Sequence, residues 1–290
     1  MRIAIVGIRS MLGSRLGLQL QKSSHSIVTA GRSPEDDIHL DLTKPYKPNS
    51  GLGQFDALVH CAASFEKEGL EGATRNELAN AMGALQVGQL ARDAHCGHVI
   101  LISSISALPE NVGLSSYGLS KRHGQECLEW ACNREGITFT ALQPSQLYDE
   151  CGIARKHQPL LYHIVDCARA GRDFPLYGNQ DPLRNYLHLQ DLLTVIQAVL
   201  DKRIRGCYPV VHPRSHTVSE VANTAFSVFR RGGKVVSRPE MPDIEAFFIP
   251  RSQQIFELTE VEPTIELRRG ITWIAESAAC SGPLQSAVAP

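Results

Sequence analysis

The sequence predicts an α/β protein whose first half forms a doubly wound parallel sheet. Short runs of consecutive apolar residues, such as residues 3–6, indicate strands that are buried on both faces. These runs alternate with helical patterns, in one of which Leu12, Leu16 and Leu20 share a face. Strands and helices that alternate at this pitch predict parallel strands joined by right-handed crossovers.

The elements can be placed in order along the chain. Strands are predicted from consecutive apolar residues over 3–6, 27–30, 38–40, 57–60, 99–102 and 138–142. Helices are predicted from apolar residues at helical spacing over 10–22, 73–95, 115–135, 191–200 and 218–230. Beyond Pro144, proline, glycine and histidine become frequent and strands are harder to place. The tail, residues 277–290, is expected to fray.

The pattern divides the chain into two domains. We expect residues 1–145 to form a cofactor-binding domain and residues 146–290 a smaller α/β substrate-binding domain. A later segment near residues 181–200 can return to the first domain.

Composition excludes several classes of protein. With 43% hydrophobic residues the chain is too apolar to be disordered, and no apolar run is long enough to span a membrane. A net charge of −1 argues against binding to nucleic acid. The 8 cysteines show no zinc spacing, so we expect reduced thiols, no metal site and a cytoplasmic location. A first strand that begins near Arg2 leaves no room for a signal peptide.

A glycine turn between the first strand and the first helix is the candidate cofactor site. Backbone N–H groups at a helix N-terminus bind pyrophosphate in this context. Ser10 stands where the dinucleotide fingerprint has its middle glycine, so a turn that binds nothing stays an alternative. The cofactor contacts expected here come from Gly7, Arg9, Ser10, Met11, Leu12 and Gly13.

The end of the second strand indicates which nicotinamide dinucleotide is bound. Arg32 follows this strand and no carboxylate occurs before Glu35, whereas NAD-binding proteins place an acidic residue there. Arg9 can reach the same 2′-phosphate, so NADP(H) is favoured over NAD(H), and two solvent-exposed arginines are the alternative. Asp41 is placed to accept a hydrogen bond from an adenine amino group, or it is an ordinary turn residue.

Tyr117 and Lys121 form the strongest catalytic pattern. Four residues apart, they share one helix face, and a lysine ammonium near a phenol lowers the pKa of that phenol. Such a phenol exchanges a proton with a carbonyl or alcohol oxygen as hydride moves. Ser103 and Ser104 close a strand at the carboxyl edge of the sheet, where ligands bind in open α/β folds. We assign the substrate-binding hydroxyl to Ser104, with Ser103 as the alternative.

These motifs resemble those of extended short-chain dehydrogenases/reductases of the NAD-dependent epimerase/dehydratase family. The resemblance covers most of residues 1–200, and its further motifs are Asp41-Leu42, His60-Cys61-Ala62-Ala63, Asn80, Pro144 and Arg184-Asn185-Tyr186-Leu187-His188. It implies a Rossmann domain in which Asn80 supports the proton relay, Lys121 also binds the nicotinamide ribose, and Arg184 contacts nucleotide phosphates of the substrate. The other contacts that it implies are Leu42, Cys61, Ala62, Ala63, Ser103, Tyr117, Pro144 and Leu147 for the cofactor, and Ser106 for the substrate.

Within this family, residues 7–14 are similar to the loop of GDP-fucose synthases, which use NADPH. The similarity supports Arg9 and Arg32 as phosphate ligands. Those enzymes place a cysteine after the serine pair for C3/C5 epimerisation, and family dehydratases have an Asp-Glu pair there, whereas this chain has Ile105 and Ser106. Of the reactions of this family, only hydride transfer then has its residues in this chain. His157 and His163 are either an additional acid or ordinary histidines.

The motifs and the resemblance together predict an NADPH-dependent reductase of a nucleotide-linked keto-sugar. The alternatives are a nucleotide-sugar C4 epimerase with tightly bound NAD, a reductase of another carbonyl compound, and a dinucleotide-binding sensor without turnover. A homodimer would use the helices over 76–94 and 116–130. The residues that would form either this contact or internal core are Leu78, Leu85, Leu128 and Trp130.

Overall fold

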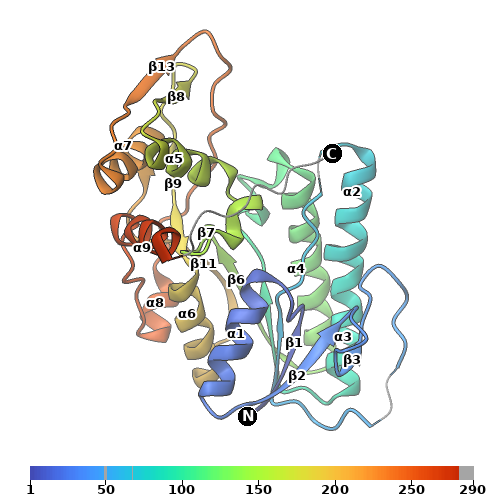
Figure 1. The fold of residues 1–290 in the computed structure, drawn as a ribbon. Coiled ribbons are helices and arrows are strands. Elements are labelled where there is room, and N and C mark those ends of the chain that lie inside the picture. Colours follow the sequence, from blue (N-terminus) through green and yellow to red (C-terminus); the bar gives the residue numbers. More distant parts are fainter. Residues whose placement is uncertain (49–50, 67, 281–290) are drawn as a thin grey trace. The chain divides into compact units, whose positions relative to one another are not determined.

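The chain forms two compact units in the computed structural model, which describes residues 1–48, 51–66 and 68–280 (Figure 1). The first unit comprises Met1–Ser145, Leu192–Val211 and Phe248–Glu262. The second unit comprises Gln146–Asp191, His212–Phe247 and the chain from Pro263 onward. Each unit is therefore assembled from three separate segments of the sequence.

The first unit is built on a 7-stranded sheet of parallel strands in the order β11-β6-β5-β4-β1-β2-β3. The chain begins in β1, moves outward to β3, and then crosses to the other side of β1 for the remaining strands. This course confirms the doubly wound α/β fold. The strands are β1 Arg2–Val6, β2 Ser26–Gly31, β3 Ile38–His39, β4 Ala57–His60, β5 His98–Ile102, β6 Thr138–Pro144 and β11 Gly206–Val210.

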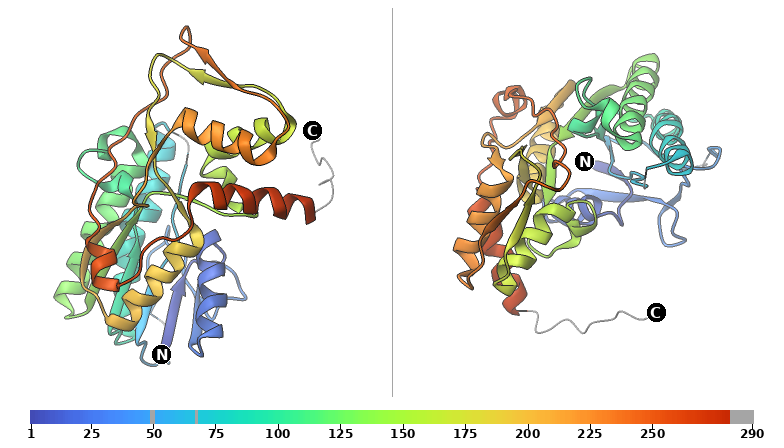
Figure 2. Two further views of the ribbon diagram at one scale, coloured as in Figure 1. Left: turned by 90° about the vertical axis from the view of Figure 1, so that its left-hand side faces the viewer. Right: turned by 90° about the horizontal axis from the view of Figure 1, so that it is seen from above.

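Helices cover both faces of this sheet (Figures 1 and 2). One face carries α3, Gly83–Asp93, and α4, Ser116–Arg134. The other face carries α1, Met11–Lys22, and α6, Leu189–Lys202, which lie side by side. Gln19 joins these two helices by donating a hydrogen bond to the Leu193 carbonyl at 3.3 Å.

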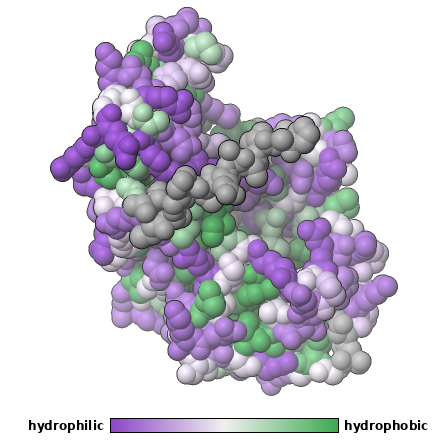
Figure 3. Space-filling model, viewed as in Figure 1, coloured by the Kyte–Doolittle hydropathy of each residue, from purple (hydrophilic) through white to green (hydrophobic). Residues whose placement is uncertain are grey.

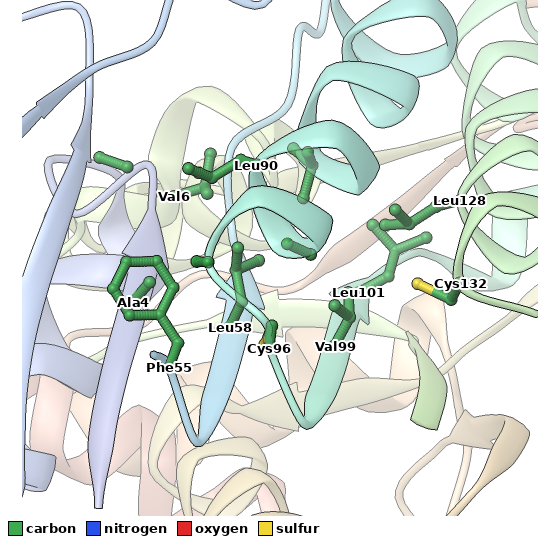
Figure 4. Packing of buried hydrophobic residues seen from close by; sticks show 14 of the residues in the cluster. Ala4, Val6, Phe55, Leu58, Leu90, Cys96, Val99, Leu101, Leu128 and Cys132 are labelled. Atoms are coloured by element: carbon green, nitrogen blue, oxygen red, sulfur yellow. The ribbon is translucent and has the colours of Figure 1, made fainter. Parts of the chain in front are cut away.

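Alternate residues of each central strand serve opposite faces of the sheet. Ala4 and Val6 of β1 lie in the hydrophobic cluster beneath α3 and α4 (Figure 4). Ile5 faces α1, because a Cβ added at Gly17 would lie 3.7 Å from its Cδ1. Burial on both faces explains why the strands consist of consecutive apolar residues. Leu128 is fully buried in the same cluster, so it belongs to the internal core, the second of its two predicted roles.

The helix predicted over 73–95 consists of three consecutive segments. They are α2 Leu70–Asn76, a π-helical turn η1 Glu77–Met82, and α3. A π-helical turn holds an extra residue, so a pattern based on α-helical spacing does not reveal it. The predicted tail also differs, because α9 continues to Cys280, and residues 281–290 lie outside the described residues.

The second unit contains three pairs of short strands. β7 Gln146–Tyr148 pairs with β10 Tyr186–His188, β9 Leu183–Arg184 with β12 His216–Thr217, and β8 Phe174–Tyr177 with β13 Val235–Arg238. Its helices are α5 Pro159–Ala170, α7 Val218–Phe229 and α9 Leu267–Cys280, and α7 packs against both others. The end that carries β8 and β13 is mainly hydrophilic on the face shown in Figure 3.

Shorter helical turns complete the chain. They are η2 Ile105–Ala107, η3 Val112–Leu114, η4 Ile153–Lys156 and α8 Gln254–Thr259. Among the described residues, no helix is both long enough and apolar enough to cross a membrane.

Candidate active site

The glycine turn after β1 has the backbone geometry that a bound pyrophosphate requires. Gly7 has a φ of +85°, and a Cβ added there would lie 2.7 Å from the Ala62 nitrogen. A Cβ at Gly13 would lie 2.3 Å from the Gly7 carbonyl oxygen, so α1 packs closely against the turn. Glycine is therefore needed at both positions, for backbone conformation at the first and for packing at the second.

Ser10 takes the position predicted for the middle glycine and caps α1. Its hydroxyl accepts a hydrogen bond from the Gly13 N–H at 3.0 Å. The N–H groups of Met11 and Leu12 have no hydrogen-bond partner within the described part of the chain. The Leu12 side chain is buried in the core, so this residue can offer a ligand only its backbone. These free donors at a helix N-terminus fit the phosphates of a dinucleotide.

Arg9 is paired with two carboxylates instead of standing free for a phosphate. Its Nη2 donates to Glu35 Oε2 at 2.7 Å, and its Nε lies 3.7 Å from Asp36 Oδ1. The Asp36 side chain is 3% exposed and also accepts from the Ser33 N–H at 3.0 Å. Arg32 is exposed and has no partner among the described residues. The two predicted phosphate ligands thus lie in different electrostatic surroundings.

Asp36 is a candidate cofactor residue that the sequence analysis missed. Its Oδ2 would lie 2.6 Å from a Cβ added at Gly31, the last residue of β2. The carboxylate therefore occupies the end of β2, where acidic residues bind the ribose of NAD. Gly31 was the signal in the sequence that could have revealed Asp36. A glycine at this position leaves room for the Asp36 carboxylate to return to the end of β2.

Asp41 and Leu42 have structural contacts. The Asp41 carboxylate accepts from the Thr43 N–H at 3.1 Å and from the Thr43 hydroxyl at 2.7 Å, and Thr43 lowers its pKa. These bonds are typical of a turn aspartate, and the contact with an adenine amino group stays a prediction. Leu42 is buried, and its carbonyl accepts from Gln86 Nε2 at 3.0 Å.

The residues after β4 lie directly beside the glycine turn. The N–H groups of Cys61 and Ala62 both donate to the Val6 carbonyl, at 2.9 and 3.1 Å. Ala63, by contrast, is exposed. Burial raises the pKa of the Cys61 thiol to about 12, so this cysteine is not a nucleophile at neutral pH.

The Ser104 side chain lies close enough to the Tyr117 phenol to lower its pKa. Ser104 follows β5, and its Oγ accepts from the Ser106 N–H at 3.1 Å. Ser103 points elsewhere: it is 3% exposed, and its hydroxyl lacks a hydrogen-bond partner in the part of the chain that the structure describes. The geometry therefore favours Ser104 for the substrate hydroxyl, and leaves Ser103 as a buried donor that a cofactor could satisfy.

Lys121 is buried close to the ends of β4 and β5. Its Nζ donates to the Ile102 carbonyl at 2.6 Å, and burial lowers its pKa to about 8. Burial and the charge of Lys121 lower the pKa of His60 to about 3, so this histidine is neutral. Burial raises the pKa of Tyr117 to about 12, against a smaller lowering by the Ser104 side chain. The expectation that Lys121 lowers the pKa of Tyr117 below its usual value is thus wrong in this structure.

Both the oxygen and the nitrogen of the Asn80 side chain are hydrogen-bonded to neighbouring residues. Its Oδ1 accepts from the Ser64 N–H at 2.7 Å, and its Nδ2 donates to the Ser64 carbonyl and the Ser120 hydroxyl, both at 2.9 Å. Its carbonyl faces α4, because a Cβ at Gly124 would lie 2.1 Å from it. Asn80 therefore links the segment after β4 to the helix that carries Tyr117 and Lys121.

Pro144 is the buried last residue of β6, paired with Val210. Two other predicted residues belong to the second unit. Leu147 is half-buried in β7. Arg184 is buried, with its guanidinium donating to the carbonyls of Leu183 and Glu245.

Other candidate groups have ordinary surroundings. The His163 ring lies 5.8 Å from the Phe174 ring, and burial lowers the pKa of His157. Among the described residues, no group of at least three His, Cys, Asp or Glu could hold a metal ion. The cysteines whose side chains are described form no disulfide bond with one another.

The arrangement of the sheet, the turn and the hydroxyl pair is that of an extended short-chain dehydrogenase/reductase. Residues 3–208 match the model of the NAD dependent epimerase/dehydratase family, and the chain belongs to this family. No curated protein matches the sequence significantly.

Solved structures share the fold at low sequence identity. The UDP-N-acetylglucosamine 4-epimerase of Bacillus cereus is 17% identical, with a TM-score of 0.76 over 94% of this chain and 95% of that one. The UDP-glucose 4-epimerase of Thermotoga maritima, solved with UDP-glucose, is 16% identical, with a TM-score of 0.76 over 97% and 99% of the two chains. MoeE5, solved with UDP-glucose and NAD, is 17% identical, with a TM-score of 0.78 over 97% and 99%.

Proposed function

We propose that the protein is an NAD-dependent 4-epimerase of a UDP-linked hexose. The observation that carries the proposal is the proximity of the Ser104 side chain to the Tyr117 phenol, with Lys121 one helical turn further along α4. Similar solved structures support the substrate class, because they are UDP-sugar 4-epimerases or hold UDP-glucose.

The phenol and its neighbours would manage the proton of the C4 oxygen. NAD, when bound, supplies the site that accepts and returns hydride at C4. Tyr117, which stays protonated at neutral pH because its pKa is about 12, would donate a proton to the keto oxygen. Removal of the proton from the 4-hydroxyl needs the phenolate, which a cationic Lys121 and the Ser104 side chain both favour. Ser104 would also orient the C4 oxygen.

The residues after the serine pair support hydride chemistry over proton removal from carbon. Ile105 is buried, and the Ser106 N–H is bound to Ser104. Neither residue supplies the carboxylate or thiol that dehydration or C3/C5 epimerisation would require.

The surroundings of Arg9 support NAD. A 2′-phosphate would have to displace Glu35 from the guanidinium and would face the Asp36 carboxylate, and like charges at short distance oppose binding. A ribose hydroxyl could instead donate to Asp36. The second candidate, an NADPH-dependent keto-sugar reductase, is favoured by one observation: Arg32 is exposed and unpaired among the described residues.

We further propose that the first unit binds the dinucleotide and the second unit binds the substrate. The guanidinium of Arg184 in the second unit is held by carbonyl groups and by the Phe247 ring at 5.0 Å, and the Glu245 carboxylate acts on its charge without a salt bridge among the described residues. A buried cation of this kind suits an anionic group of the substrate. We also propose a homodimer, supported by Leu78 on η1 and Trp130 on α4, which are 42% and 60% exposed.

Turnover and cofactor content test this function together. The nucleotide that copurifies is identified, and UDP-galactose, UDP-glucose and their N-acetylated counterparts are then supplied as substrates. We expect retained NAD, interconversion of the C4 epimers, and no net oxidation or reduction. Tyr117→Phe should abolish turnover and leave the nucleotide content unchanged. NADPH consumption without a C4 epimer as product would refute the epimerase and favour the reductase.

A further inference from the structure

Phe65 is an exposed aromatic residue that lies against Tyr117. The two ring centroids are 4.7 Å apart, with planes at 66°, which is the edge-to-face arrangement that aromatic pairs prefer. Phe65 is nevertheless 47% exposed, whereas Phe55 and Phe139 in the core are 0% and 2% exposed. Nearly half of Phe65 is therefore accessible, unlike the phenylalanines of the core.

Two buried asparagines fix the backbone on both sides of Phe65. Asn80 holds Ser64 through two hydrogen bonds, at 2.7 and 2.9 Å. Asn76 accepts from the Glu66 N–H at 3.0 Å and donates to the Ser116 hydroxyl, next to Tyr117, at 3.2 Å. Burial strengthens these bonds, so the Phe65 ring is held in a defined position although it faces outward.

The charges around Phe65 indicate which part of a nucleotide sugar it can meet. Glu66 follows it in the sequence, and the Glu68 carboxylate accepts from the Ser116 N–H at 3.2 Å. The sequence from Glu66 to Glu68 carries two carboxylates and one lysine, a net charge of −1, so it offers a diphosphate no net positive charge, whereas an uncharged hexose needs none. A phenyl ring has no hydrogen-bonding group, so it can recognise only the apolar C–H face of the sugar.

We propose that Phe65 forms a wall of the hexose subsite, where its ring packs against the C–H face of the sugar and directs the C4 oxygen to Tyr117. The inference rests on the proposed function and extends it with a residue that determines sugar affinity and orientation. Phe65 acts by contact with the substrate and has no part in the transfer of protons or hydride.

Substitution of Phe65 separates sugar recognition from nucleotide recognition. Phe65→Ala and Phe65→Leu are compared with the wild type by initial-rate kinetics on UDP-galactose, and UDP alone is titrated as a competitive inhibitor. Loss of an aromatic contact should raise KM about three- to tenfold for Phe65→Ala, and less for Phe65→Leu. The inhibition constant of UDP should stay within about twofold, because UDP lacks the hexose.

The pH profile supplies a second readout. Because burial raises the pKa of Tyr117, and the phenolate takes the proton of the 4-hydroxyl, removal of the neighbouring ring should admit water and move the acid limb of the kcat profile to lower pH. Leu119→Ala is the matched control, since Leu119 is also apolar and 42% exposed on α4, and this variant should resemble the wild type in KM and in pH profile.

Each outcome decides the inference. An unchanged KM in both Phe65 variants, or equal weakening of UDP-galactose and UDP, would overturn the role of Phe65 while leaving the epimerase activity established. A wild-type protein that interconverts no UDP-hexose would instead overturn the proposed function and this inference with it. Phe65→Leu keeps an apolar side chain, so its KM for UDP-galactose tests the role of Phe65 if Phe65→Ala fails to fold.

Discussion

Replacement of Gly124 by alanine tests whether the π-helical turn positions the catalytic helix. The added Cβ would lie 2.1 Å from the Asn80 carbonyl oxygen and 3.0 Å from its carbon. A carbon atom and a carbonyl oxygen make contact at about 3.3 Å, so α4 and η1 would have to separate by roughly 1.2 Å. Both contacted atoms belong to the backbone, and a side-chain rotation cannot relieve the clash.

Two opposing effects set the change in stability. Alanine is the better helix former by about 1 kcal/mol, but overpacking of a close contact costs about 1–3 kcal/mol. We therefore expect a net loss of up to about 2 kcal/mol. At about 2–4 °C per kcal/mol, the melting temperature should fall by several degrees. Movement of Asn80 also moves Ser64 and Ser120, and a misplacement of about 1 Å can lower kcat by about 10²-fold.

Thermal unfolding, kcat and NAD titration together provide the assay. NAD binding should survive at least in part in Gly124→Ala, because the atoms nearest to the added Cβ belong to η1 and not to the glycine turn. Gly113→Ala is the control: a Cβ there meets no heavy atom within 4 Å, so stability should change by less than about 0.5 kcal/mol and kcat should not change. A Gly124→Ala protein with wild-type melting temperature and kcat would refute the link from Gly124 through Asn80 to the site.

Four further substitutions probe the cofactor turn, the buried lysine and the exposed helix face. Gly7→Ala places a side chain at a φ of +85°, with its Cβ 2.7 Å from Ala62. This change should weaken NAD binding by at least about tenfold in a fluorescence titration. An unchanged affinity would mean that the cofactor binds elsewhere. The pKa of Lys121 is about 8 in the folded protein against 10.5 as its ordinary value, so the unfolded chain binds more protons between these pH values. The free energy of unfolding, relative to Lys121→Met, should therefore rise with pH across this window by up to about 3 kcal/mol in denaturant titrations, and a fall would contradict the assignment. Leu78→Glu and Trp130→Glu should convert a dimer into a monomer by light scattering, whereas an unchanged mass would exclude these residues from the contact.

The sheet could be predicted closely because each strand carries its own signal. Burial on both faces gives consecutive apolar residues, and the strand predicted over 57–60 is β4 as observed. The π-helical turn could not be predicted in the same way. It brings the Asn80 carbonyl against Gly124, a contact between segments far apart in the sequence, and nothing in the spacing of residues 73–95 records it.

In the candidate site, too, features set by neighbouring residues in the sequence could be predicted, and features set by tertiary contacts could not. Spacing alone places Tyr117 and Lys121 on one helix, and the structure brings the Ser104 hydroxyl to Tyr117. Burial is a tertiary property, which is why the predicted direction of the Tyr117 pKa was wrong. Asp36 was missed for a related reason, since only the turn after β2 carries its carboxylate back to Gly31 and Arg9.

The division of each unit into three segments affects how the protein can fold during synthesis. The edge strand β11 lies 65 residues after Ser145 (210 − 145), and the last segment of the first unit ends 117 residues after it (262 − 145). At about 5–20 residues per second, β6 waits roughly 3–13 s for its neighbour, and the first unit is incomplete for roughly 6–23 s. During that interval β6 presents an unpaired parallel edge, of the kind that joins other chains. The ribosome-bound chain therefore has a period of aggregation risk that a contiguous cofactor domain would not have, and a chaperone that covers the β6 edge would act within it.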